Sequence, residues 1–191
     1  MNLVKYFNVT IIIFFSFFIN WYSANIGVMP IDTFGFFDTG YNILNGQLPI
    51  RDYWAYTGIT VDYLQSLFFL LFGSNWNSYI IHSSFINVIS SLIFYLFLRD
   101  LKISKVFSLI YTLSFATLLY PVSGTPFAYL HAYIFSILGI MIFFLFNNLK
   151  KRKLLICIPL IFFFAFFSMQ TPTIYIGFVL LFLMFYLIIF K

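Results

Sequence analysis

The chain has 191 residues, of which 63% are hydrophobic, 25% are aromatic and only 8% are charged, and its net charge is +5. A soluble domain carries about a quarter charged residues, and it has no way to keep 30 phenylalanines out of water. The composition therefore excludes an ordinary soluble protein and predicts an integral membrane protein. The single Cys157 excludes an internal disulfide framework. The basic residues stand in short clusters between apolar runs, so we expect no nucleic-acid partner.

Six apolar segments approach the roughly 20 residues that a helix needs to cross a bilayer core. In chain order they cover residues 7–23, 78–98, 105–120, 129–147, 154–168 and 174–190. We expect one all-α transmembrane domain over residues 1–191, with about six transmembrane helices and a large first loop at 24–77. The first segment could also be a signal peptide. It is long for that role and "WYSAN" is a poor cleavage site, so we favour an uncleaved helix.

The segment "DYLQSLFFLLF" (Asp62–Phe72) decides the topology, because it is apolar but short and begins with a charge. If it crossed the membrane, every later loop would change sides. If it lies in the interface instead, nine of the ten basic residues fall on one side and four of the five acids on the other. The positive-inside rule makes the basic side cytoplasmic. We therefore expect an interfacial helix here, both termini in the cytoplasm and the first loop outside.

The first loop begins with an amphipathic pattern. Phe37, Tyr41 and Leu44 recur at positions i, i+4 and i+7, which is one face of a helix. Gly46 is placed to end this helix. Asp32 comes before it, and we expect Asp32 near the N-cap position.

The same loop gathers three of the five acids, Asp32, Asp38 and Asp52, beside Arg51. Each has a structural explanation: Asp32 could cap a helix, Asp38 could face water, and Arg51 and Asp52 could be ordinary charges near a membrane surface. However, long loops are often functional. A carboxylate on the outer face could act as a general base, or help to place a metal or a phosphate-binding arginine. We expect Asp32 to face a cavity shared with Arg51 or Asp52.

The order of these residues resembles a known family. A first span is followed by an acid, then "ILNGQLPIRDYW", then "YLQSLFFLLFGSN". This resembles the first outer loop of the GT-C superfamily of membrane glycosyltransferases. It is most similar to bacterial relatives of dolichyl-phosphate-mannose protein mannosyltransferases and aminoarabinose transferases. Members often read "ILxGxxPYRDxW", with an acid fourteen residues before the glycine, as Asp32 stands before Gly46. Arg51 and Asp52 match the "RD", with Ile50 in place of the tyrosine.

Later parts of the chain match the family more loosely. "MQTPTIYIG" (Met169–Gly177) is similar to a "KQTP" element, with Met169 where lysine is common, and it makes Gln170 a candidate. Many members place an arginine shortly after "LFG", and His82 is its nearest counterpart here. His131 is expected on the same side of the membrane. A lone polar residue in a membrane helix is more often a hydrogen-bonding partner between helices than a ligand.

The resemblance implies a GT-C-like fold with juxtamembrane helices in the first loop. It also implies sugar transfer from a polyprenyl-phosphate-linked donor to an acceptor on the outer face of a bacterial inner membrane. Asp32 would bind or deprotonate the acceptor, and a divalent metal is left open. Typical members have more spans, so the chain looks like an N-terminal part whose partner is the remaining half. The alternatives are a non-catalytic protein of the same fold, or a transporter-like protein. The substrate-binding candidates are Arg51, Asp52, Asp38, His82, His131 and Gln170.

Overall fold

The structure is a computed structural model, and it describes residues 3–28, 30–55, 57–120, 124–149 and 153–190. All of the named elements in these ranges are helices, so the all-α expectation is confirmed. Each of the expected apolar segments coincides with a helix. The helices are α1 (Leu3–Ala24), α2 (Pro30–Leu44), α3 (Thr60–Phe72), α4 (Trp76–Asp100), α5 (Lys105–Leu119), α6 (Ala128–Leu149), α7 (Lys153–Phe166) and α8 (Gln170–Phe190).

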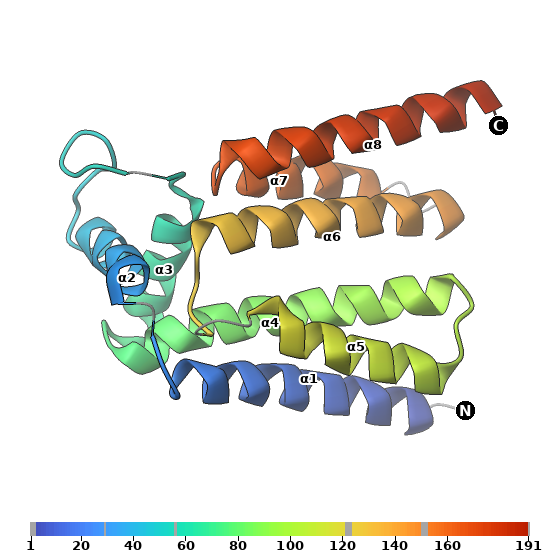
Figure 1. Cartoon of the computed structure of the whole chain (residues 1–191), viewed down its shortest axis with the longest axis horizontal. Coiled ribbons are helices and arrows are strands. Elements are labelled where there is room, and N and C mark those ends of the chain that lie inside the picture. The colour runs from blue at the N-terminus through green and yellow to red at the C-terminus, as the bar shows by residue number, and fades with distance from the viewer. Residues whose placement is uncertain (1–2, 29, 56, 121–123, 150–152, 191) are drawn as a thin grey trace.

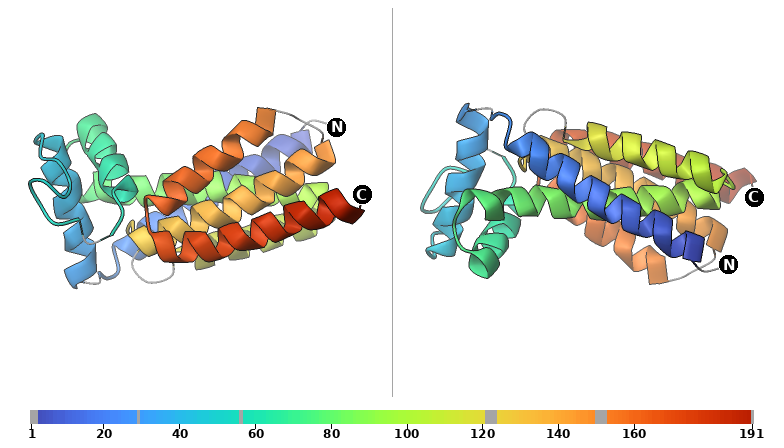
Figure 2. Two further views of the ribbon diagram at one scale, coloured as in Figure 1. Left: turned by 90° about the horizontal axis from the view of Figure 1, so that it is seen from above. Right: turned by 90° about the horizontal axis from the view of Figure 1, so that it is seen from below.

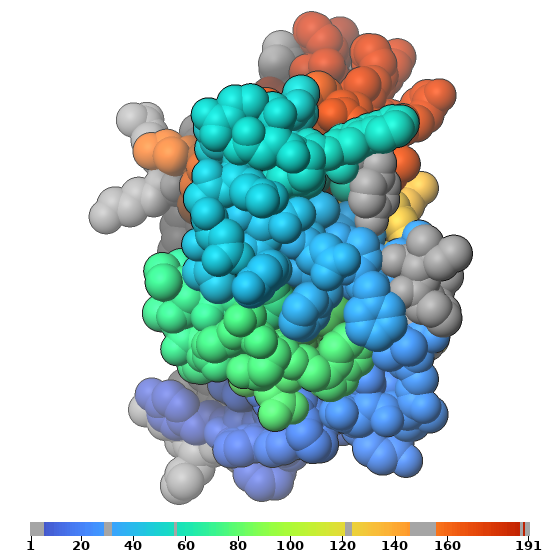
Figure 3. Space-filling view, turned by 90° about the vertical axis from the view of Figure 1, so that its left-hand side faces the viewer, coloured from blue at the N-terminus to red at the C-terminus, as the bar shows by residue number. Residues whose placement is uncertain are grey.

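The helices form two groups with different directions (Figure 1). Helices α1, α4, α5, α6, α7 and α8 run along the long axis of the molecule as a bundle. Helices α2 and α3 lie across one end of this bundle, as both views in Figure 2 show. We call α2, α3 and the described residues between them the cap layer. Figure 3 looks onto this end, where residues of the first loop, in blue to cyan, cover the middle of the face.

Within the described residues, four helices are long and apolar enough to cross a membrane: Tyr6–Ala24 in α1, Trp76–Asp100 in α4, Ala128–Leu145 in α6 and Gln170–Leu187 in α8. The described parts of the chain therefore have the composition and helix lengths of an α-helical membrane protein. Helices α5 and α7 are apolar but have only 15 and 14 residues. At 1.5 Å per residue each spans about 22 Å, which is less than the roughly 30 Å of a hydrocarbon core.

Charge is divided between the two ends of the bundle. The cap layer carries Asp32, Asp38, Asp52 and Asp62, whereas the turn between α4 and α5 carries Arg99, Lys102 and Lys105 at the opposite end (Figure 1). The basic residues at 150–152 and 191 lie outside the described residues. Arg51 in the cap layer and Asp100 at the end of α4 are the exceptions. For these other described charges, the separation expected along the chain is also a separation in space.

Small polar side chains hold the bundle together. Along α4 the buried positions include several serines, Asn87 and His82. The Asn20 side-chain amide on α1 donates to the hydroxyls of Ser83 and Ser84, both at 3.0 Å, and to the Gly124 carbonyl at 2.9 Å. Asn87 donates to the backbone carbonyl of Ala116 at 3.0 Å. The hydrophobic effect does not drive helix association in lipid, so close packing and short polar contacts such as these specify which helices are neighbours.

Helix α2 differs in two details from the sequence-based expectation. It begins at Pro30, which suits a first helical position because proline lacks an N–H. Asp32 therefore lies in the first turn, not at the N-cap, and its charge faces the positive end of the helix dipole. The buried face includes Phe36, which is 3% exposed, whereas Tyr41 is 46% exposed. The buried face of α2 is rotated away from the expected one because Gly40 lets α3 approach closely. A Cβ at position 40 would lie 2.7 Å from Cγ of Gln65.

The end of α2 is as expected. Gly46 has a φ of +81°, a left-handed conformation that glycine adopts without steric cost. Its N–H donates to the Ile43 carbonyl at 2.9 Å, and the N–H of Gln47 donates to the Asn42 carbonyl at 3.0 Å. This pair of bonds is the Schellman motif that ends many helices. It turns the chain out of α2 and towards the residues that carry Arg51.

Candidate functional site in the cap layer

The cap layer encloses one carboxylate almost completely. Asp62, in the first turn of α3, is only 2% exposed. Its Oδ1 accepts a hydrogen bond from the Thr39 hydroxyl of α2 at 2.8 Å, and its Oδ2 accepts from the Tyr53 hydroxyl at 3.0 Å. Asp62 therefore joins α2, α3 and the segment between them through two side-chain bonds.

The local sequence explains why Asp62 is buried. Asp62, Gln65, Ser66 and Phe69 recur at the spacing of one helix face, and all four are buried. Phe69 belongs to the core between cap layer and bundle, which also contains Phe36 and Val61 of the cap layer together with Tyr79 and Phe127 of the bundle. A carboxylate in register with this apolar face has to enter the core with its helix.

The backbone ties the start of α3 to a distant part of the chain. The N–H of Gly58 donates to the Ser168 carbonyl and that of Thr60 to the Phe167 carbonyl, both at 2.9 Å. A Cβ at position 58 would lie 1.9 Å from the Phe167 oxygen, so only glycine fits at that contact. The turn between α7 and α8, which leads into the "MQTP" sequence, is thereby fixed beside the cap layer. Gln170 begins α8 next to this turn and is exposed.

Burial sets the proton affinity of Asp62. Loss of hydration raises its pKa from 3.8 to about 6, although the bonds from Thr39 and Tyr53 act in the opposite direction. The pKa of the Tyr53 hydroxyl is also raised, first by burial and then by the nearby Asp62 charge. A carboxyl group with a pKa of about 6 exchanges its proton readily near neutral pH, which is the property that a general acid or base needs.

Arg51 and Asp52 form a separate pair at the surface. The guanidinium donates through Nε to Oδ1 at 2.8 Å and through Nη2 to Oδ2 at 2.6 Å, and the Leu48 N–H also donates to Oδ2 at 2.8 Å. The Arg51 bond is the main reason that the pKa of Asp52 falls to about 2. Asp52 is therefore ionised at every physiological pH and orients Arg51. Residues 50–55 line a hollow of about 460 Å³ around this pair.

The two other acids of the first loop lie on α2. Asp32 is half-buried in its first turn and Asp38 is exposed. Asp32 is not among the residues that line the hollow at Arg51 and Asp52. Twelve residues of α2 separate Asp32 from Leu44, which corresponds to about 18 Å along the axis. A direct role for Asp32 beside Arg51 stays a prediction.

His82 and His131 are brought together, but inside the protein. Both are fully buried, and their ring centroids are 5.1 Å apart. His82 Nδ1 bonds to Oε1 of Gln65 on α3 at 2.8 Å, and its ring stacks on Phe68 at 4.9 Å. His131 Nδ1 bonds to the Phe127 carbonyl at 2.8 Å. The expected hydrogen bonding between helices is present for His82. Contact of either histidine with a substrate stays a prediction.

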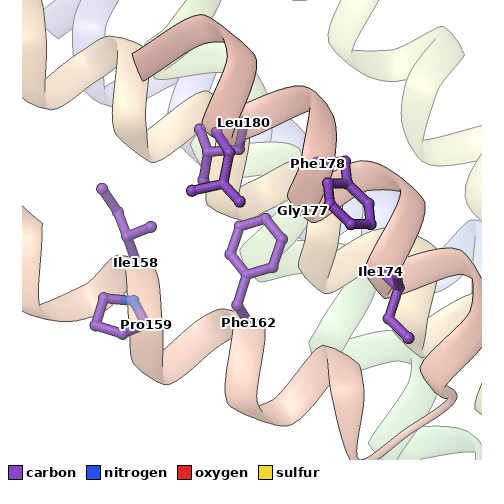
Figure 4. Close-up of a pocket in the computed structure, with 8 residues that line it drawn as sticks. Ile158, Pro159, Phe162, Ile174, Gly177, Phe178 and Leu180 are labelled. Carbon is purple, nitrogen blue, oxygen red and sulfur yellow. The ribbon is translucent and has the colours of Figure 1, made fainter. Parts of the chain in front are cut away.

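Two apolar grooves are lined by described residues, and the first of them borders the cap layer. One, of about 400 Å³, lies between the start of α3 and the end of α7 and is lined by Ile59, Thr60, Tyr63, Leu64, Phe163, Phe164 and Phe167. The other, of about 390 Å³, lies between α7 and α8, where Phe162 points towards Gly177 (Figure 4). The lining residues of both carry no charge. Among the described residues no group of three or more His, Cys, Asp or Glu side chains is placed to hold a metal ion.

Comparison with protein-family models, with curated proteins and with solved structures found no match to the chain. The residues themselves must therefore indicate the function. The sequence interpretation passed over Asp62, Thr39, Tyr53 and Gln65. A signal for two of them was present, because Asp62 and Gln65 stand at i and i+3 on the same face as Phe69. The partners Thr39 and Tyr53 have no such local signal.

Proposed function

We propose that the chain acts in the transfer of a sugar from a polyprenyl-phosphate-linked donor to an acceptor, as a membrane glycosyltransferase of the GT-C type. In this proposal all six helices of the bundle cross the membrane, with the bilayer locally thinned around the short α5 and α7, and the cap layer is on the outer face of a bacterial inner membrane. The acids at the cap end and the bases at the opposite end support this orientation, because basic loops stay in the cytoplasm.

One observation carries the proposal. The first loop does not extend into solvent but folds back as two helices across the end of the bundle (Figure 2), and it holds four carboxylates and Arg51 there. Charged groups near lipid are energetically costly, so where they occur they are usually functional. An acid for the acceptor hydroxyl and an arginine for a phosphate are the groups that a sugar transfer from a lipid phosphate requires.

The parts of the cap layer suit different parts of this reaction. Arg51 uses Nε and Nη2 on Asp52, which leaves Nη1 for an oxygen of the donor phosphate. The groove between α3 and α7 is where we place the isoprenoid chain, because its lining is apolar and it borders the cap layer. Asp32 is the group that we assign to the acceptor hydroxyl.

The test is a transfer assay in membranes that contain the chain together with the products of its neighbouring genes. Radiolabelled polyprenyl-phosphate sugars are the donors, and label incorporation into acceptor is measured. Asp32→Asn should reduce transfer by about 100-fold or more, because general base catalysis contributes roughly 10²–10⁴-fold. Asp100→Asn is the control, because it makes the same chemical change at the end of α4, which lies at the opposite end of the bundle from the cap layer; it should change transfer less than about twofold.

Two results would contradict the proposal. Unchanged turnover in Asp32→Asn, with normal membrane insertion, rules out its role as a base. Absence of transfer from every polyprenyl-phosphate sugar tested, with the wild-type protein stably inserted, rules out the glycosyltransferase function itself.

A further inference from the structure

A group of buried polar atoms lies where the cap layer meets the bundle. Nε2 of His82, Nε2 of His131 and the hydroxyl of Tyr120 are all enclosed, and none has a hydrogen-bond partner among the described residues. His131 is the common neighbour: its ring centroid lies 5.1 Å from that of His82 and 6.1 Å from that of Tyr120. Buried polar atoms in native proteins are nearly always paired, so three unpaired ones on neighbouring rings call for a ligand.

The bonds at Nδ1 fix what each histidine offers. The Phe127 carbonyl can only accept, so His131 Nδ1 carries the proton and donates to it. Gln65 presents its Oε1 to His82 Nδ1, so this nitrogen also carries the proton. In neutral rings both Nε2 atoms are therefore bare acceptors. A ligand that satisfies both Nε2 atoms has to donate two hydrogen bonds.

The Tyr120 hydroxyl, the third of the unpaired groups, favours a water molecule over a metal ion as the ligand. A metal ion would satisfy the two Nε2 lone pairs, but it would face the O–H of Tyr120, which lies in the same cluster and adds no negative charge while protonated. The cap layer contributes one more buried atom without a partner among the described residues, Nε2 of Gln65, which is a donor as well. Water donates two bonds and accepts up to two, so it complements this set without bringing charge into the interior.

We propose that His82, His131 and Tyr120 form a buried site for one water molecule. The water donates to Nε2 of both histidines and accepts from the Tyr120 hydroxyl, which gives it the three partners typical of buried water. Through the bond between His82 and Gln65, it links α3 of the cap layer to α4, α6 and the residue after α5. The site is independent of the proposed glycosyltransferase function.

The chain allows a direct test because it contains only two histidines. Protein labelled with nitrogen-15 in histidine is placed in lipid bilayers, and solid-state NMR records the ring nitrogens and the polarisation that they receive from water protons. His82→Gln removes one ring and thereby assigns the signals. We expect two neutral rings protonated at Nδ1, with both Nε2 atoms accepting hydrogen bonds and both receiving polarisation from water.

Three results would overturn the site. The first is that the Nε2 atoms receive no polarisation from water protons. The second is that the rings are protonated at Nε2, and the third is that the ring nitrogen signals shift when a chelator removes metal ions. Tyr120→Phe should weaken the transfer from water to both Nε2 atoms. Tyr111→Phe, which is 50% exposed on α5, is the matched control and should leave it unchanged. Equal spectra for the two variants would exclude Tyr120 as a partner. If Tyr120→Phe does not fold, the wild-type spectra still show whether both Nε2 atoms accept hydrogen bonds from water.

Discussion

The buried carboxylate of Asp62 should make the cap layer sensitive to pH. Its pKa is about 6 in the folded protein and 3.8 when exposed. Well below pH 3.8, Asp62 is protonated both in the closed cap layer and in a cap layer that has opened to water, so the closed form has its full stability. As the pH rises from about 4 to 6, the opened cap layer ionises Asp62 while the closed one still holds the proton, so the opened form is favoured. The stability that protonated Asp62 gives to the closed cap layer is lost as the pH rises through about 6.

The size of the effect follows from the shift. One pKa unit corresponds to 1.36 kcal/mol, so closing should weaken by about 3 kcal/mol across this range, or roughly 100-fold in the opening equilibrium. Hydrogen exchange followed by mass spectrometry, with the protein in bilayer discs, measures this opening for the peptide that contains α3. After correction for the chemical exchange rate, protection should fall about 100-fold between pH 4 and 7.

Two variants isolate the cause. Asp62→Asn is neutral at every pH, so its protection should not change across the range. Its amide still accepts from Thr39 and can donate to the Tyr53 hydroxyl, so at pH 4 it should resemble the wild type within about 1 kcal/mol. Asp52→Asn should keep the wild-type slope, because the pKa of Asp52, about 2, lies below the range. A flat wild-type profile, or a slope retained in Asp62→Asn, would refute the reasoning.

The remaining predictions concern stability and are measured by thermal unfolding in detergent. Gly124→Ala should destabilise the protein by about 2 kcal/mol or more, because φ is +68° and the new Cβ would lie 2.6 Å from the backbone oxygen of Asn20. Gly27→Ala is the control and should change the stability little, because a Cβ there would have nothing within 4 Å. Equal melting temperatures for the two variants would contradict this explanation. Ile50→Gly should stabilise by about 1 kcal/mol, since Ile50 holds a φ of +71° and is 83% exposed, and a lowered melting temperature would show that its side chain has contacts in the membrane. Asn20→Ala should cost roughly 2 kcal/mol through the three bonds that it loses, whereas the exposed Asn25→Ala should cost less than 1 kcal/mol.

The helices could be predicted closely because local physics determines them. An apolar run in a chain this rich in phenylalanine has to form a helix, since no other short segment satisfies its own backbone in lipid. The expected segment 78–98 became Trp76–Asp100, and 62–72 became Thr60–Phe72. The glycine that ends α2 was also predictable, because the left-handed residue after a helix is usually glycine.

The chemistry of the site was harder to predict because its partners are distant in sequence. Thr39 and Asp62 are 23 residues apart, and His82 is 17 residues from Gln65. Nothing in the local pattern selects one threonine among several as the partner of an acid. The first-loop resemblance directed attention to Asp32, whereas burial and hydrogen bonding single out Asp62.

The contact between the start of α3 and the α7–α8 turn has a consequence for biosynthesis. Gly58 and Thr60 take their backbone partners from Phe167 and Ser168, more than a hundred residues later in the chain. A protein emerges from the ribosome N-terminus first, so α1 to α6 are made while these two amides have no acceptor. These two backbone bonds between the cap layer and the bundle therefore form only after the α7–α8 turn has been synthesised, although the bonds inside the cap layer have both partners long before.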